Sequence, residues 1–436
     1  MLAFPNPNNR LNTDLNSYVQ FLGHAFGGRF RTDNRDIEAF EGALRERFGA
    51  RHAICVYQCR VGIYLAIKAL IRPGQEVILS PYTIADVVNM VIFAGGRPVF
   101  ADVERHTCNI SASEVEKLIN PKTGAVLITH LHGVAADALR IKSICDSRDV
   151  PMVEDCAQAI AVKEQGKPVG TIGDVGVFSF EMHKNIATWM GGAVVTDRDD
   201  VVEKIRAELE TFSTPPFPGL RRKVKSGLLD DVAKLPILFE LVTYPVLRYG
   251  HLRKVDFINR RNRRKPQESK PATALPDEYK SRYTPFQARI GLSQLKNIDR
   301  EIQARIDRGL RYHDGLKDID GLILPPVQAV GSNSFPDGSN TFLWFPVQYS
   351  GREELLRFMF ENGRDVAAGH FGNCADTSRY REFQRDCPNA RRVASDLLYL
   401  PTYPSYSLRE VDRNIETIRR FFDRAKPSRN KPLNGA

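Results

Sequence analysis

An aspartate and a lysine that lie 29 residues apart are the residues whose types and positions best fit a chemical role. Asp155 ends the apolar segment PMVED, and Lys184 follows the apolar segment VGVFSF. A lysine that forms a Schiff base must lose its proton, which a pocket of low dielectric constant promotes. A carboxylate placed opposite a pyridine nitrogen keeps that nitrogen protonated, so that the ring accepts electrons. The pair therefore fits Schiff-base chemistry on a pyridine cofactor.

Each of the two residues also has a simpler interpretation. Asp155 has the position of a strand-end acid that caps the following helix, and Lys184 has the position of an exposed loop lysine. The residues alone leave these alternatives open.

A third element resembles a phosphate site. The segment ICVYQCRVGIYLAIKAL reads as a strand, a turn at Gln58–Cys59–Arg60, and a helix. The N–H groups at a helix N-terminus bind anions, and an arginine there adds a charge-assisted contact. The competing interpretation of Arg60 is a surface arginine, which the helix dipole disfavours at this end. Ser179 is a further hydroxyl candidate, with a buried strand serine bonded to backbone as its alternative.

These residues require a sheet that brings strand ends together, and residues 36–212 predict one. Short apolar runs rich in β-branched residues alternate with amphipathic helical segments, among them a helix over 111–119 that opens on a serine cap. Such alternation predicts an α/β fold with a mainly parallel sheet covered on both faces, whose ligands bind at the carboxyl ends of the strands. The expected strands are residues 53–57, 76–82, 98–103, 125–133, 151–157, 175–180 and 192–197.

The remaining chain is divided into an irregular segment and a smaller domain. Residues 213–219 read as a loop, and 259–278 as a basic linker. Residues 285–316 predict one long amphipathic helix, and the segments after it alternate as in a small α+β domain. We therefore expect a large domain over 1–300, with an insert at 213–278, and a small domain over 301–436.

Composition indicates a globular enzyme and excludes several other classes. The seven cysteines are scattered without a CxxC pair, which predicts no metal site and a reducing, cytoplasmic compartment. The N-terminus lacks the pattern of a secretory signal, and no apolar run of about 18 residues predicts a membrane span.

The net charge of +10 is concentrated in one place. Residues 213–278 carry 14 Lys/Arg against 7 Asp/Glu, which is +7 of the total. Three interpretations compete: a solvated variable loop, a peripheral membrane contact through apolar residues between Arg221–Lys225 and Arg260–Lys265, or contact with a partner chain or anionic substrate. Aromatic residues are sparse in the basic runs, so we expect no nucleic-acid binding.

The sequence resembles the DegT-type sugar aminotransferases from about Gly27 to Phe422. The matching stretches, in order, are GQEVILSPYTIADVVNMVIFAGGRPVFADV, VLITHLHGVAADALRI, PMVEDCAQAI, GDVGVFSFEMHKNIATWMGGAVVTD, QARIGLSQL and LLYLPTYP. The resemblance implies the fold-type-I architecture of pyridoxal 5′-phosphate (PLP) transferases and a homodimer whose sites are completed across the subunit interface.

The resemblance also implies roles for individual positions. Lys184 matches the lysine that binds the cofactor covalently, and Asp155 matches the partner of the ring nitrogen. Gln158 matches a glutamine near the ring, and Ser179 matches a phosphate-binding serine. Gly191 and Gly192 match paired glycines after the lysine loop.

Several positions depart from the family pattern. Cys59 and Arg60 stand where many members have Gly-Thr at the phosphate turn. Ile84 stands where many carry an aromatic residue on the cofactor ring, and Tyr82 is a candidate substitute. Lys280 aligns with an asparagine through which the partner subunit usually reaches the phosphate, although Arg282 nearby is retained. An acidic residue common in the lysine loop is replaced around Trp189–Met190.

The resemblance implies the transfer of an amino group, with L-glutamate as the expected donor, to a keto-sugar linked to a nucleotide. Surface polysaccharide or secondary-metabolite biosynthesis is the expected setting. Relatives that replace the lysine with histidine catalyse dehydration, so Lys184 favours transamination. The alternatives are a non-catalytic sensor or scaffold with this fold and a PLP-dependent sugar dehydratase.

Overall fold

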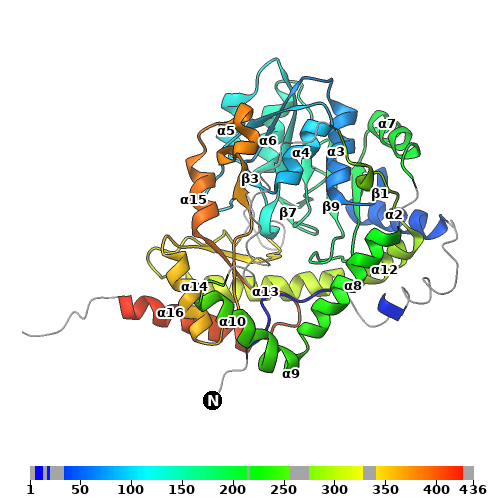
Figure 1. The fold of residues 1–436 in the computed structure, drawn as a ribbon. Helices are drawn as coiled ribbons and strands as arrows, with labels where there is room; N and C mark the ends of the chain where they lie inside the picture. Colours follow the sequence, from blue (N-terminus) through cyan, green and yellow to red (C-terminus); the bar gives the residue numbers. More distant parts are fainter. Residues whose placement is uncertain are drawn as a thin grey trace, which may run out of the picture.

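A computed structural model of the chain describes residues 5–12, 17–19, 34–213, 217–255, 274–327 and 340–425 (Figure 1). A seven-stranded sheet is its central element. The strands lie side by side in the order β1 (His52–Val56), β10 (Gly192–Thr196), β9 (Val175–Ser179), β6 (Met152–Asp155), β5 (Thr123–Thr129), β2 (Glu76–Leu79) and β4 (Arg97–Phe100). Only β10 runs against its neighbours, so the predicted mainly parallel α/β sheet is confirmed.

Helices cover both faces of this sheet because successive strand residues point to opposite sides. Val77 and Leu79 belong to one hydrophobic cluster, while Ile78 between them belongs to the other. The first cluster is covered by α3 (Cys59–Leu70), α4 (Ala85–Phe93) and α7 (Asp199–Glu210), and the second by α2 (Arg35–Phe48), α5 (Ala112–Leu118) and α6 (Ala138–Asp146). Apolar residues on both faces explain why the strand sequences read as continuous apolar runs.

The C-terminal part has a sheet of its own. Its antiparallel strands lie in the order β11 (Phe345–Gln348), β14 (Leu397–Leu400) and β12 (Ala367–Ala368). The helices α13 (Ile298–Leu316), α14 (Arg352–Glu361) and α16 (Leu408–Ala425) pack with it around a third hydrophobic cluster. The division of the chain after residue 300, close to the start of α13, remains a prediction.

A short segment of the C-terminal part packs against elements beside the large sheet. It comprises β13 (Gly372–Asn373), the short helices η4 (Cys374–Asp376) and η5 (Ser378–Phe383), and α15 (Pro388–Asp396). β13 pairs with β3 (Tyr82–Thr83), and the Tyr380 hydroxyl donates to Asn89 Oδ1 at 2.9 Å. The short helix η1 (Leu131–Gly133) follows β5. A hairpin of β7 (Lys163–Glu164) and β8 (Lys167–Pro168) lies between β6 and β9 in the sequence.

The segment after α7 is largely helical. It contains α8 (Phe217–Ala233), α9 (Pro236–Leu238), a π-helical turn η2 (Phe239–Thr243) and α10 (Tyr244–Leu252). The loop expected up to residue 219 is therefore wrong over 217–219, which begin α8. Pro236 and Pro245 lie in first turns, where a missing N–H is tolerated. Residues 259–273 of the expected basic linker lie outside the described residues, and η3 (Asp277–Tyr279) follows them.

Two expectations about helix ends are corrected. The single helix expected over 285–316 is two helices, α12 (Pro285–Leu295) and α13. Asn297 stands at the start of α13, with Asp299 and Glu301 in its first turn, a pattern that favours a new helix start. Ser111 does hold the N-cap position of α5, but its hydroxyl pairs with Ser113 Oγ at 2.9 Å and caps no helix N–H.

Candidate functional site

A cavity of about 300 Å³ lies at the carboxyl ends of the parallel strands. This volume is at the lower end of the range for small-molecule sites. It lies where doubly wound sheets bind their ligands. Its lining includes six of the predicted site residues, namely Cys59, Arg60, Ile84, Asp155, Ser179 and Lys184.

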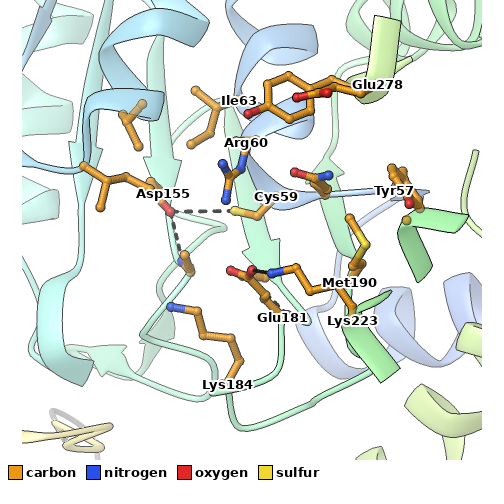
Figure 2. A pocket seen from close by; sticks show the side chains of 18 of the residues that line it. Tyr57, Cys59, Arg60, Ile63, Asp155, Glu181, Lys184, Met190, Lys223 and Glu278 are labelled. Atoms are coloured by element: carbon orange, nitrogen blue, oxygen red, sulfur yellow. Dashed lines mark hydrogen bonds and ion pairs between the residues drawn. The ribbon is translucent and has the colours of Figure 1, made fainter. Parts of the chain in front are cut away.

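Asp155 reaches this cavity as the last residue of β6 (Figure 2). Its Oδ1 accepts the Ala157 N–H at 3.0 Å and lies 4.0 Å from the Cys59 sulfur. Burial raises the pKa of the Asp155 carboxyl above its ordinary value, against the lowering effects of the Ala157 N–H and the Lys184 charge. The site thus holds a buried carboxylate that a cationic partner would stabilise.

Lys184 lies in the loop between β9 and β10, and Figure 2 shows its side chain entering the cavity from the lower edge of the view. The backbone N–H of Lys184 donates to the Glu181 carbonyl at 3.0 Å. Burial lowers the pKa of the Lys184 amine, although Glu181, Cys59 and Asp155 act in the opposite direction. A lowered pKa increases the fraction of neutral amine, which is the nucleophilic form.

Packing behind this loop fixes its course. Gln294 Oε1 accepts the Ala187 N–H at 2.7 Å, and Trp189 is fully buried against Phe286, with ring centroids 5.7 Å apart. Trp189 adopts a left-handed conformation with φ of 60°, which a non-glycine residue keeps only where its surroundings hold it. The loop that carries Lys184 is therefore held by α12 and by its own buried tryptophan.

The turn before α3 supplies the candidate phosphate site. α3 starts at Cys59, and the N-cap residue Gln58 makes no side-chain cap within the described part of the chain. The first N–H groups of a helix have no partners inside that helix and attract anions. A Cβ on Gly192 would meet Cys59 Cα at 2.8 Å, so a glycine is needed where β10 passes this turn. The Arg60 guanidinium forms an ion pair with Asp86.

Side chains that the sequence did not single out complete the lining. Arg222 and Lys223 come from α8, and Tyr279 comes from η3. Lys223 Nζ binds Glu181 Oε1 at 2.8 Å. Burial raises the pKa of Glu181, but Lys223 and Arg60 outweigh this effect and bring it to about 2. Two residues of the basic run Arg221–Lys225 thus line the cavity, and contact with an anionic substrate was one of the three interpretations of the insert.

Three of the predicted site residues lie outside the lining of this cavity. Tyr82 is fully buried on β3, where its ring meets Phe371 edge-on at 5.6 Å. Gln158 accepts the His132 N–H at 2.7 Å. Lys280 is partly exposed and pairs with Asp277 at 2.9 Å. Tyr82 therefore does not take the place of a stacking aromatic residue here, and Ile84 itself faces the cavity.

Three potential metal ligands lie behind Asp155. Among the described residues, His130, Glu154 and Cys156 place ligand atoms within 4.8 Å of one another. The polar atoms of His130 and Glu154 already have partners: His130 binds Glu154 at 3.0 Å, and Glu154 also accepts N–H groups of the loop 170–173. These bonds brace the strand end that carries Asp155.

The residues present fit a cofactor that has an aldehyde, a ring nitrogen and a phosphate. A buried amine with a lowered pKa, a buried carboxylate and the open N-terminus of α3 line one cavity. Each matches one of the three groups in charge and in bonding capacity.

Comparisons with known proteins agree with this geometry. The sequence profile of the DegT/DnrJ/EryC1/StrS aminotransferase family matches residues 18–224 and 254–419. The chain is 29% identical over 394 residues to the spore coat polysaccharide biosynthesis protein SpsC of Bacillus subtilis, covering 88% of each chain. It is 38% identical over 169 residues to the GDP-perosamine synthase of Vibrio cholerae, covering 38% of this chain and 46% of that protein.

A solved structure shows the same fold with a cofactor. The GDP-4-keto-6-deoxy-D-mannose-3-dehydratase of E. coli, with bound hydrated PLP, superposes with a TM-score of 0.71 at 18% identity, covering 96% of this chain and 100% of that one. The similarity supports the fold-type-I architecture.

Proposed function

The chain belongs to the DegT/DnrJ/EryC1/StrS aminotransferase family, and on this premise we propose that it transfers an amino group from an amino acid to a keto-sugar. One observation carries the proposal: Asp155 and Lys184 line the same cavity at the carboxyl end of the sheet. Burial lowers the pKa of the Lys184 amine, as a covalent cofactor site requires. It raises the pKa of the Asp155 carboxyl, whose charged form a protonated ring nitrogen would stabilise.

A nucleotide-linked sugar is the substrate class that the relatives support. One relative is named for GDP-perosamine synthesis and another for spore coat polysaccharide biosynthesis. We propose the same kind of setting for this chain, surface polysaccharide or secondary-metabolite biosynthesis. Arg222 and Lys223 at the cavity provide positive charge for an anionic nucleotide.

PLP is the proposed cofactor, and when bound it supplies an electron-accepting ring that stabilises negative charge on the substrate carbon. The carboxylate of Asp155 holds the ring nitrogen protonated. The N-terminus of α3 at Cys59–Arg60, together with Ser179, holds the phosphate. Ile84 packs on the ring where other members use an aromatic side chain.

Lys184 performs the proton transfers. Its Nζ, more often neutral because burial lowers its pKa, takes a proton from the α-carbon of the amino acid in the first half-reaction. In the second half-reaction it delivers a proton to the carbonyl carbon of the keto-sugar. Glu181, whose carboxylate forms an ion pair with Lys223, provides a fixed negative charge near this amine.

A direct assay tests the proposal. The purified protein with PLP receives L-glutamate and one member at a time of a panel of nucleotide-linked keto-sugars. We expect one 2-oxoglutarate for each amino-sugar, with the added nitrogen found by mass spectrometry. A sugar that loses water without gaining nitrogen would establish a dehydratase instead. No reaction with any sugar or amino acid, together with no PLP binding, would favour a non-catalytic protein.

We further propose a cytoplasmic homodimer. All seven cysteines are free thiols, as expected in a reducing compartment. Lys280 and Arg282 lie next to α12, outside the cavity of their own chain. This position is compatible with the role that the resemblance implies for the position of Lys280, which is to reach the cofactor phosphate of a second copy. Gln158 is expected near the cofactor ring of its own chain.

A further inference from the structure

The helical segment from α8 to α10 exposes an unusual number of apolar side chains. Ten of the twelve large hydrophobic side chains exposed among the described residues lie between positions 228 and 249. The group from α8 and its end consists of Leu228, Leu229, Val232 and Leu235. Scattered exposed apolar residues need no explanation, but a contiguous set marks an interaction site.

The second group lies on α9, η2 and α10. It consists of Ile237, Leu238, Leu241, Val242, Val246 and Tyr249. Ile237 is 75% exposed and Leu241 67%. Figure 1 shows α9 at the lowest point of the molecule, between α8 and α10. We call the two groups together the apolar ridge.

The ridge is a regular exposed face of these helices and is not part of the hydrophobic core. Its residues recur at helical spacing, as 228, 229 and 232 do on α8. Leu220 and Val224 of α8, Phe239 of η2 and Tyr244 of α10 are buried. The segment therefore has apolar side chains that pack inside the protein and others that are exposed.

Contacts with the body of the protein hold the ridge in place. The Tyr244 hydroxyl and Arg248 Nε both donate to the Phe360 carbonyl on α14, at 2.9 and 3.0 Å. Thr243 Oγ1 donates to the Ala233 carbonyl at 2.7 Å, which joins the end of α8 to the start of α10. The exposed side chains thus sit on a fixed scaffold.

Basic side chains flank the ridge in the sequence, although Arg222 and Lys223 line the cavity and Lys234 is paired with Asp230. Residues 217–255 contain eight Lys/Arg and three Asp/Glu. Two of the three acids are engaged, since Asp230 pairs with Lys234 at 2.6 Å and Asp231 accepts the Tyr18 hydroxyl. Lys225 precedes Leu228 and Leu229 by three and four residues, which places it on the same side of α8.

The basic charge continues past the other end of the ridge. Arg253 and Lys254 are exposed where α10 ends. In the sequence, residues 260–265 add five basic side chains, although they lie outside the described residues. Apolar side chains between basic groups are the signature of a surface that lies on an anionic membrane.

We propose that the apolar ridge docks the protein peripherally on membranes rich in anionic phospholipid. The aliphatic side chains would enter the boundary between headgroups and acyl chains, while the basic residues contact lipid phosphates. Among the described residues, no helix has the length and apolar character to span a bilayer. Protein interfaces favour aromatic, methionine and arginine side chains, whereas nine of the ten ridge residues are aliphatic.

Vesicle sedimentation with the full-length protein tests this proposal. We expect the protein to sediment with vesicles of phosphatidylcholine and phosphatidylglycerol but not with phosphatidylcholine alone, and binding should weaken as salt is raised. Ile237→Asp and Leu241→Asp should each lower the affinity roughly tenfold or more. Leu408→Asp places the same charge at an exposed leucine away from the ridge and should leave binding unchanged.

Several outcomes would overturn the proposal. These are no sedimentation with either vesicle, equal binding to both, or unchanged binding of the ridge variants. Light scattering that shows self-association lost in Ile237→Asp would make the ridge an interface between copies. Thermal melting and the absorbance response to L-glutamate should be the same in all variants, so that this test does not depend on the proposed reaction.

Discussion

At the scale of single residues, burial shifts Asp155 and Lys184 in the same sense, toward their uncharged forms. It raises the pKa of the carboxyl and lowers that of the amine. A neutral amine is needed for bond formation, so the effect on Lys184 favours the proposed chemistry directly. The effect on Asp155 is offset when a protonated ring nitrogen binds, because opposite charges in a buried site stabilise each other.

Replacing Asp155 by asparagine keeps the shape of the side chain and removes its charge. We expect turnover to fall on the order of 10²- to 10⁴-fold, since the ring nitrogen loses the group that keeps it protonated. The visible absorbance of the cofactor should persist, because Lys184 is intact. Asp314→Asn, at an exposed position of α13, serves as the control. Turnover equal to wild type would remove Asp155 from the proposed site.

The lowered pKa of Lys184 predicts how cofactor loading depends on pH. A folded-state pKa below the ordinary lysine value of about 10.4 means that the neutral amine becomes populated at lower pH than in a free lysine. The rate at which apoprotein regains its visible band with PLP should therefore rise with pH. Its midpoint should lie below that ordinary value. A midpoint at or above it would show that the amine is not desolvated.

At the scale of elements, the strand–helix alternation was predictable because each strand carries its own apolar signature. Asp155 was predicted at the end of a strand, and Lys184 in the loop that follows one. The break between α12 and α13 carried a readable signal in Asn297, Asp299 and Glu301, which the continuous amphipathic pattern obscured.

Contacts between distant segments could not be predicted in this way. Tyr82 and Ile84 are two residues apart and both were candidates for the cofactor ring. Tyr82 is buried while Ile84 lines the cavity, because β3, which contains Tyr82, pairs with β13, nearly 300 residues later in the sequence. Lys223 reaches Glu181 only because α8 folds back to the cavity. Local periodicity carries no information on such long-range pairing.

The helix α8 makes a prediction of its own. Arg222 lines the cavity on the side of the insert, where it can contact an anionic group of the nucleotide sugar. Arg222→Ala should raise KM for the sugar roughly tenfold and leave kcat little changed, as expected when a charge-assisted contact is lost. Lys225→Ala, one turn further along α8 and outside the lining, is the matched control. Equal effects of both variants would indicate a general effect of charge.

At the scale of the whole molecule, the large sheet, the C-terminal sheet and the α8–α10 segment are joined by packed elements. α8 begins at the cavity and leads to the apolar ridge. The fold class was predictable from the sequence, whereas the exposure of the ridge was only one of three interpretations of the insert that the sequence left open. Apolar residues at helical spacing ordinarily face a core, and only the structure shows that α8 and α10 have a second face.

The proposed dimer leads to a complementation experiment. If Lys280 serves the cavity of a second copy, a Lys280→Glu variant should lose activity while its own Lys184 remains intact. Mixing it with inactive Lys184→Ala after denaturation and refolding should restore part of the activity, because mixed dimers contain one complete site. Light scattering should give the mass of a dimer. A monomer, or no recovery on mixing, would contradict the shared site.

The most direct test of the central claim is the absorbance spectrum of the PLP-loaded protein before and after L-glutamate. We expect a visible band that depends on Lys184 and that glutamate converts to a near-ultraviolet band as the amino group is taken up. Lys184→Ala should lack the lysine-dependent band. A wild-type band that is retained in Lys184→Ala, or the absence of any band with added PLP, would contradict the assignment of this site.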